Sequence, residues 1–212
     1  MSTKNIDKVL TLLKKEYPNA KIALNFGNPL EVLVATVLSA QCTDERVNLV
    51  TKSLFKKYRK VEDYAKADPK TFEQEIRSTG FYRNKAKNII STAQKILKNF
   101  DGKVPDSMDK LMELPGVARK TANIVLFNGF GKVEGIPVDT HVRRLSQRLG
   151  LTKNEDPDKI EQDLMKLLDK KEWGKFSYLL IDHGRKICDA KKPICLDCVL
   201  QKLCPSRKEF YP

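Results

Sequence analysis

Residues 114–122 read LPGVARKTA and join two segments with helical spacing, near residues 106–113 and 118–128. Pro115 ends the first helix, because proline has no amide hydrogen to donate. Gly116 allows the backbone to approach another surface closely, since it carries no side chain. The amides of the turn and the positive end of the second helix form a cradle for a phosphate group. This stretch therefore predicts two helices that meet at an anion-binding turn.

The turn matches the helix-hairpin-helix motif, which contacts the DNA backbone rather than the bases. An ordinary hairpin of two helices has similar turn residues and stays open as the alternative for this stretch alone. The composition favours a polyanionic partner, because 40 Lys and Arg against 27 Asp and Glu give a net charge of +13 over 212 residues. A basic surface that contacts only water would have the same composition.

The rest of the chain also has helical periodicity. Asn28-Pro29, Thr43-Asp44 and Asp68-Pro69 are typical helix starts, and Gly80 is a typical helix end. Further helices are expected near residues 86–100, 139–149, 157–169 and 173–187. No segment has the pattern of a strand or hairpin. The sequence therefore predicts an all-α fold of one large or two small domains, with enough hydrophobic residues, 41%, for a core.

The N-terminal segment, MSTKNIDKVL, is polar from the start, and no run of 18 apolar residues occurs in the sequence. These features indicate neither membrane insertion nor export. We therefore expect a cytoplasmic protein, associated with the nucleoid through DNA.

Four of the five cysteines form a C-x6-C-x2-C-x5-C pattern: Cys188, Cys195, Cys198 and Cys204. Four thiolates within 17 residues can surround one inorganic centre. A structural zinc usually takes its ligands from two C-x2-C pairs, but only Cys195 and Cys198 are so spaced, which favours a [4Fe-4S] cluster over zinc. A pair of disulfides is the third alternative, disfavoured because no secretory segment is present.

Lys120 opens a helix that is apolar around most of its circumference, so we expect that helix to be buried and the lysine to be partly desolvated. Desolvation, the helix N-terminus and the adjacent Arg119 favour the neutral amine that a Schiff-base nucleophile needs. Considered alone, a lysine here more often pairs with a phosphate.

Asp139 lies in the stretch Ile136-Pro137-Val138-Asp139-Thr140-His141, just before an expected helix, and is predicted to be its N-cap. A capping carboxylate that faces a cleft can also hold a lysine or stabilise positive charge on a sugar, and the two roles are compatible. His141 and His183 have no partner pattern, so we expect structural or phosphate-facing roles for them.

Several separated motifs now coincide in order: LSAQCTD at 38–44, GFYRNKA at 80–86, the hairpin with Lys120, VDTH at 138–141, and HGR at 183–185 before the cysteines. In this order and with this cysteine spacing, nearly the whole sequence resembles endonuclease III, the iron-sulfur family of helix-hairpin-helix DNA glycosylases. The resemblance implies two helical domains with a DNA-binding cleft between them. These would be a six-helix domain at 21–132 and a cluster domain built from 1–20 and 133–212.

The resemblance implies a bifunctional DNA glycosylase and abasic-site lyase of base excision repair that acts on oxidised pyrimidines in double-stranded DNA, as a monomer. Lys120 resembles the catalytic amine and Asp139 the catalytic carboxylate. The four cysteines of the pattern resemble the ligands of the [4Fe-4S] cluster, whereas Cys42 is expected to be a small buried residue.

Gln41 and Phe81 resemble the residues that enter the duplex, one filling the gap left by a flipped base and one wedging the stack. The full set of expected DNA-binding residues is Gln41, Phe81, Leu114, Pro115, Gly116, Val117, Ala118, Arg119, His141 and Lys191.

Two residues depart from the family pattern. Ala118 stands where the hairpin usually has a second glycine, so a left-handed conformation there would be strained. Phe81 stands where a smaller aliphatic wedge is common, which bears on lesion preference. A mismatch glycosylase of the same superfamily without lyase activity, or a non-catalytic DNA-binding module, remain the alternatives, although neither requires both Lys120 and Asp139.

Overall fold

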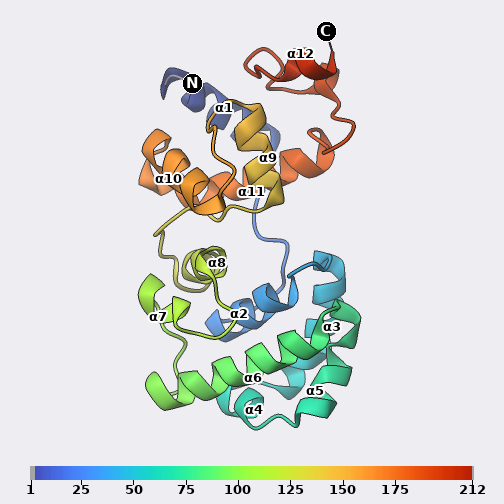
Figure 1. Ribbon diagram of the computed structural model, residues 1–212, viewed down its shortest axis with the longest axis vertical. Coiled ribbons are helices and arrows are strands. Elements are labelled where there is room, and N and C mark those ends of the chain that lie inside the picture. Colours follow the sequence, from blue (N-terminus) through green and yellow to red (C-terminus); the bar gives the residue numbers. More distant parts are fainter. Residues whose placement is uncertain (1–2, 212) are drawn as a thin grey trace. The chain divides into compact units, whose positions relative to one another are not determined.

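The computed structural model describes residues 3–211. Over this range the chain forms twelve α-helices and two short 3-10 helices, with no strand (Figure 1). The all-α prediction is confirmed. The chain divides into two compact units, which we call the central unit, Ala23–Glu134, and the terminal unit, formed by residues up to Ile22 together with those from Gly135 on.

The central unit contains seven α-helices and one 3-10 helix among its residues: α2 (Pro29–Leu38), α3 (Asp44–Lys57), α4 (Val61–Ala65), α5 (Pro69–Glu75), η1 (Arg77–Thr79), α6 (Tyr82–Asn99), α7 (Met108–Met112) and α8 (Arg119–Phe130). The long helix α6 packs against α4 and α5, and α2 packs against α8 (Figure 1). The short helix α4 was not predicted, and the helix that starts at Pro69 ends at Glu75 and continues as η1 instead of running unbroken to Gly80.

The predicted helix starts of this unit are confirmed by side-chain caps. Asn28 accepts a hydrogen bond from the amide of Glu31, Thr43 from that of Arg46, and Asp68 from that of Thr71. Each cap satisfies an amide that has no partner within its own helix.

Helices α2 and α8 pack closely because of a glycine. Leu30 and residues 32–38 of α2 are all buried. A Cβ atom added to Gly129 of α8 would lie 3.2 Å from Cα of Pro29, at the start of α2. The absence of a side chain at Gly129 therefore permits the close approach of α8 to the start of α2.

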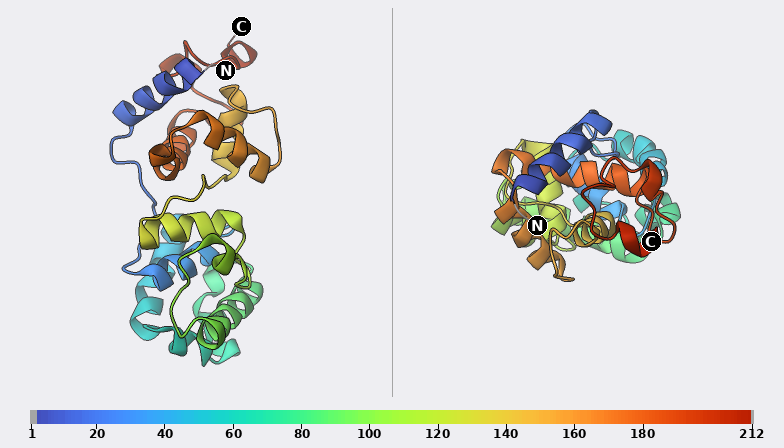
Figure 2. Two further views of the ribbon diagram at one scale, coloured as in Figure 1. Left: turned by 90° about the vertical axis from the view of Figure 1, so that its left-hand side faces the viewer. Right: turned by 90° about the horizontal axis from the view of Figure 1, so that it is seen from above.

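The terminal unit contains the remaining helices: α1 (Thr3–Glu16), α9 (Thr140–Arg148), α10 (Pro157–Leu167), α11 (Lys170–Lys186), η2 (Cys195–Asp197) and α12 (Arg207–Phe210). Helix α11 contacts both α1 and α9 (Figure 2). No helix among the described residues is long and apolar enough to cross a lipid bilayer.

Candidate active site and cysteine loop

The hairpin turn between α7 and α8 has one residue that must be glycine. Gly116 has a φ of +75°, in the left-handed region. A Cβ atom there would lie 2.7 Å from Nδ2 and 2.9 Å from Cγ of Asn88. The turn itself is closed by a hydrogen bond of 3.1 Å from the amide of Val117 to the carbonyl of Leu114. Both the conformation and the close contact therefore disfavour a side chain at Gly116.

One face of α6 holds this turn in place. Thr92 Oγ1 donates to the carbonyl of Pro115 at 2.8 Å, and Lys95 Nζ donates to the carbonyl of Glu113 at 2.7 Å. Asn88, which contacts Gly116, is four residues before Thr92 and so lies on the same face of the helix. The contacts of this face were not predicted, although its polar residues follow helical spacing.

Ala118 corrects one expectation. It has a φ of −86° and a ψ of 169°, so it is extended, and the strain predicted for a left-handed conformation does not arise. Ala118 occupies the N-cap position of α8 but has no side chain that can cap it. The N-cap of α8 therefore contributes no side-chain hydrogen bond to the first turn of the helix.

Lys120 is the second residue of α8. The predicted burial of this helix is confirmed for one side only, where Ala122, Val125 and Leu126 are fully buried. The Lys120 side chain, however, is exposed, so the expected desolvation is wrong. Lys120 lies about 200° around the helix from Ala122, given 100° per residue, and so faces away from the core.

Asp139 is the N-cap of α9, as predicted. Its Oδ1 atom accepts a hydrogen bond of 2.8 Å from the amide of Val142, and the residue is half-buried. The segment before it is fixed at two points: the amide of Ile136 donates to Oε1 of Glu161, and Ser177 Oγ donates to the carbonyl of Pro137. The carboxylate is therefore held by its own helix and by buried contacts of the preceding segment.

The two histidines have structural contacts. His183 is 2% exposed, with Nδ1 2.9 Å from the hydroxyl of Tyr17 and Nε2 3.3 Å from Sγ of Cys198. Burial lowers the pKa of His183 to about 4, so its imidazole is neutral at pH 7. His141 is half-buried, and its Nδ1 lies 3.2 Å from the guanidinium of Arg144. Burial of His183 excludes a phosphate-facing role for it.

The residues expected to enter DNA lie in two turns of the central unit. Gln41 has a φ of +52° and Phe81 a φ of +48°, and both are exposed, with 63% of Phe81 accessible. Cys42, next to Gln41, is half-buried rather than buried as expected. Left-handed conformations are uncommon for residues other than glycine, so these two positions are unusual in the same way.

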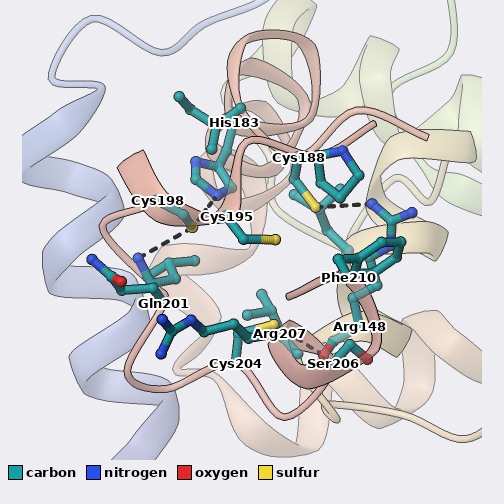
Figure 3. A pocket seen from close by; sticks show the side chains of 15 residues that line it. Arg148, His183, Cys188, Cys195, Cys198, Gln201, Cys204, Ser206, Arg207 and Phe210 are labelled. Atoms are coloured by element: carbon teal, nitrogen blue, oxygen red, sulfur yellow. Dashed lines mark hydrogen bonds between the residues drawn. The ribbon is translucent and has the colours of Figure 1, made fainter. Parts of the chain in front are cut away.

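The four cysteines of the C-terminal pattern line one pocket, together with residues from α9, α11 and α12 (Figure 3). All four are free thiols and all are half-buried, so no disulfide forms among them. Burial raises the pKa of Cys195, of Cys204 and of Cys198, the last to about 11. Among the described residues, no three side chains of His, Cys, Asp or Glu converge closely enough to surround a single metal ion.

Two arginines of α9, for which no role was predicted, organise the start of the cysteine loop. Arg148 donates to Sγ of Cys188 at 3.2 Å and to the carbonyls of Asp189 and Ala190, and its guanidinium lies 4.6 Å from the ring centre of Phe210 (Figure 3). Arg144 donates to the carbonyl of Cys188 at 2.9 Å. Their spacing of four residues, which places both on one face of a helix, was the available signal.

Lys191, expected to bind DNA, lies in the same loop and is exposed. Its amide and that of Lys192 both donate to Oδ1 of Asp189, at 2.8 and 3.0 Å. These bonds fix the backbone of the loop and leave both lysine side chains at its surface.

The chain matches one superfamily of proteins and, within it, one family. Residues 34–170 match the HhH-GPD superfamily of base excision DNA repair proteins, a range that includes the hairpin, Lys120 and Asp139. The fold and the hairpin thus define a helix-hairpin-helix protein of base excision DNA repair. Endonuclease III of Synechocystis sp. is 55% identical over 199 residues, which cover 94% of this chain and 91% of that protein. Endonuclease III of Bacillus subtilis is 44% identical, covering 96% and 93%. The chain belongs to the endonuclease III family.

Solved structures agree with this assignment. A non-covalent endonuclease III–DNA complex and a trapped endonuclease III–DNA covalent intermediate each superpose with a TM-score of 0.94 at 44% identity, over 99% of this chain and 98% of the other. A thermostable thymine-DNA glycosylase, 22% identical with a TM-score of 0.88 over 97% of this chain and 98% of the other, shares the fold.

Proposed function

We propose that Lys120 and Asp139 are the catalytic side chains of this protein, a bifunctional DNA glycosylase and abasic-site lyase of base excision repair. The observation that carries the proposal is the position of Lys120. Its side chain is exposed on the first turn of α8, directly after a hairpin whose turn amides suit a DNA phosphate. A lysine in this place can reach a nucleotide whose backbone the hairpin binds.

The exposure of Lys120 implies that DNA itself removes water from the amine. A flipped nucleotide that covers Lys120 would replace bulk water with the sugar and with protein groups. The nucleophile would then become desolvated only when a substrate is bound.

The chemistry proceeds in two stages. In the first, Nζ of Lys120 attacks C1′ of the damaged nucleotide, the bond from C1′ to the base breaks, and the base leaves with the bonding electron pair and takes up a proton. The bond from C1′ to O4′ then breaks and O4′ takes up a proton. The nitrogen, which has now given one proton to the base and one to O4′, forms a Schiff base with C1′. In the second stage, loss of a proton from C2′ expels the 3′ phosphate, so the strand is cut by β-elimination. Water finally releases Lys120 and the unsaturated sugar.

Asp139 would stabilise the positive charge that develops on the sugar as the base departs, or accept a proton from the amine. The hydrogen bond from the amide of Val142 occupies Oδ1 and fixes the direction of the carboxylate. A rigid carboxylate needs little reorganisation when charge develops, which is the basis of electrostatic catalysis.

DNA contacts would come from three groups of residues. The hairpin, 114–119, would bind the backbone, Gln41 and Phe81 would enter the duplex, and His141 and Lys191 would contact phosphates. The exposure of Gln41, Phe81 and Lys191 supports their roles. His141 already contacts Arg144, so its part would be to help orient that arginine or to share a phosphate with it.

The cysteine pocket would hold a [4Fe-4S] cluster through Cys188, Cys195, Cys198 and Cys204. Four free thiols that line one pocket fit a cluster, which takes four cysteine thiolates as its ligands. When bound, the cluster supplies a rigid cross-link of the loop, since excision and elimination at a sugar need no electron transfer. Arg148 would hold Cys188 through a hydrogen bond to its sulfur.

Strand cutting tests the assignment of Lys120. Lys120→Gln should abolish cutting of duplex DNA that contains an abasic site, whereas Lys98→Gln, which removes an exposed charge of α6 in the same unit, should cut as the wild type does. Binding should fall little in either variant, because one charge accounts for at most one phosphate contact. Cutting by Lys120→Gln at the wild-type rate would contradict the proposal, and base excision without cutting by the wild type would favour the mismatch glycosylase alternative.

A further inference from the structure

Lys85 is a buried amine with no part in the proposed chemistry. The residue is 4% exposed and lies in the first part of α6. Burial lowers the pKa of its ammonium group, and only the nearby Cys42 opposes that effect. Burying an ammonium group is costly unless acceptors surround it, so this lysine is expected to have a specific purpose.

The acceptors of Lys85 are two backbone carbonyls from segments far apart in sequence. Its Nζ atom donates to the carbonyl of Leu38 at 2.8 Å and to that of Thr79 at 2.7 Å. Leu38 is the last residue of α2, and Thr79 is the last residue of η1. Carbonyls at a helix C-terminus have no partner in their own helix and carry partial negative charge, which suits a cation.

The two carbonyls come just before the two turns expected to enter DNA. Gln41 follows Leu38 by three residues, and Phe81 follows Thr79 by two. The amide of Lys85 also donates to the carbonyl of Phe81 at 3.1 Å. Lys85 therefore binds the Phe81 turn through its backbone and its side chain, and binds the end of α2 with the same ammonium group.

Both turns are strained in the same way. Among residues 3–211, only Gln41, Phe81 and Asp101 combine a side chain with a positive φ, and two of these three are the residues in question. Such conformations persist only where surrounding contacts enforce them. The ammonium group of Lys85 provides a contact of this kind to the segments that lead into both turns.

We propose that Lys85 is a positioning residue that holds the Gln41 turn and the Phe81 turn at a fixed spacing, so that both side chains enter the duplex together. This inference rests on the proposed roles of Gln41 and Phe81. Gln41 would fill the gap at the same time as Phe81 wedges the stack. If Lys85 fixes both turns before DNA binds, the protein does not have to order them during base flipping, and that entropic cost is avoided. Lys85 acts through these residues and does not contact the reacting atoms.

The proposal is tested with the variant Lys85→Met, which keeps the length of the side chain and removes its hydrogen-bond donors. The activity of this variant is compared on two DNA substrates. The measurement is the single-turnover rate on thymine glycol in a duplex, divided by the rate on the same lesion in a single strand. The active fraction of the enzyme cancels in this ratio, so partial misfolding does not affect it. We expect a fall of about tenfold or more, because small misplacements of positioning groups cost one to two orders of magnitude.

Two further variants define the outcome. Lys132→Met removes an exposed lysine that donates to Asp106 in the same unit, and its ratio should match the wild type. Lys85→Gln retains one amide donor group, so it should lower the ratio less than Lys85→Met does. If the Lys85→Met protein does not fold, Lys85→Gln is used in its place. An unchanged ratio in the Lys85 variant that folds would overturn the proposal.

A double variant separates the proposal from the function on which it rests. Phe81→Ala should lower the same ratio, and adding Lys85→Met should lower it little further, because both changes act at one step. If Phe81→Ala lowers the ratio and Lys85→Met does not, the Lys85 proposal fails and the wedge role stands. If Phe81→Ala slows both substrates equally, the proposed role of Phe81 fails first.

Discussion

Replacing Gly116 with alanine should displace the hairpin turn for two independent reasons, the backbone conformation of Gly116 and its close contact with Asn88. The φ of +75° places the residue in the left-handed region, where a side chain costs about 1–2 kcal/mol. The added Cβ would also lie 2.7 Å from Nδ2, 2.9 Å from Cγ and 3.0 Å from Cβ of Asn88. Because the Cβ atom of Asn88 is fixed to the backbone of α6, rotation of its side chain cannot relieve all three contacts.

A second glycine provides a matched control. Gly131, at the other end of α8, has a φ of +66°, and an added Cβ there meets no atom within 4 Å. Gly131→Ala should therefore lower the free energy of unfolding by about 1–2 kcal/mol, from the backbone alone. Gly116→Ala should lower it by about 2–5 kcal/mol, since overpacking adds about 1–3 kcal/mol.

Urea denaturation gives both free energies, and fluorescence anisotropy gives the affinity for duplex DNA with an abasic site. Gly116→Ala should weaken DNA binding more than Gly131→Ala, because it moves amides that would bind a phosphate. Adding Asn88→Ala should restore part of the stability that Gly116→Ala removes. Equal reductions of stability in the two glycine variants would show that Asn88 does not constrain the turn, which would refute the reasoning.

Three other outcomes are expected. Purified protein should contain about four irons and four labile sulfides per chain, and stoichiometric zinc from an iron-replete, anaerobic preparation would contradict the cluster. Reversing the charges of Lys191 and Lys192 should reduce the slope of log affinity against log salt by about 0.9 for each phosphate that the protein no longer neutralises, whereas an unchanged slope would leave them as lysines that contact only water. Arg148→Met should lower the thermal midpoint and the iron content, because the loop no longer has its bonds to Cys188, Asp189 and Ala190; full iron content would show that these bonds are dispensable.

Helix starts were predictable from the sequence because their signals are local. Asn28, Thr43, Asp68 and Asp139 each cap a helix through their own side chain, three residues before the amide that they bind. The break between α5 and η1 was missed, because no proline or glycine marks it.

The error about Lys120 has a simple geometric origin. The apolar character of α8 predicted burial of the whole helix, but Lys120 lies on the side opposite Ala122 and so faces solvent. Ala118 was judged from a family pattern, whereas its extended backbone suits any residue. The first prediction failed because of the direction in which one side chain points, and the second because of the backbone conformation of one residue.

The roles of Lys85 and Arg148 could not be derived from sequence alone. Lys85 binds a carbonyl 47 residues away, and Arg148 binds residues 40 to 42 positions away. The spacing of Arg144 and Arg148 shows that the two arginines share a helix face, but the acceptors of Lys85 and Arg148 are mostly backbone carbonyls, which every residue has, so no sequence pattern identifies the acceptors. Only the tertiary fold shows which carbonyls are within reach.

The most direct test of the account is to locate the covalent bond between protein and DNA. Borohydride reduces a Schiff base to a stable amine, so wild-type protein with abasic duplex DNA should give a trapped complex. Digestion and mass spectrometry should place the sugar remnant on Nζ of Lys120, and Asp139→Asn, which keeps the helix cap, should form the same adduct from a damaged base more slowly. A remnant on any other amine, or trapping that persists in Lys120→Gln, would contradict the central claim.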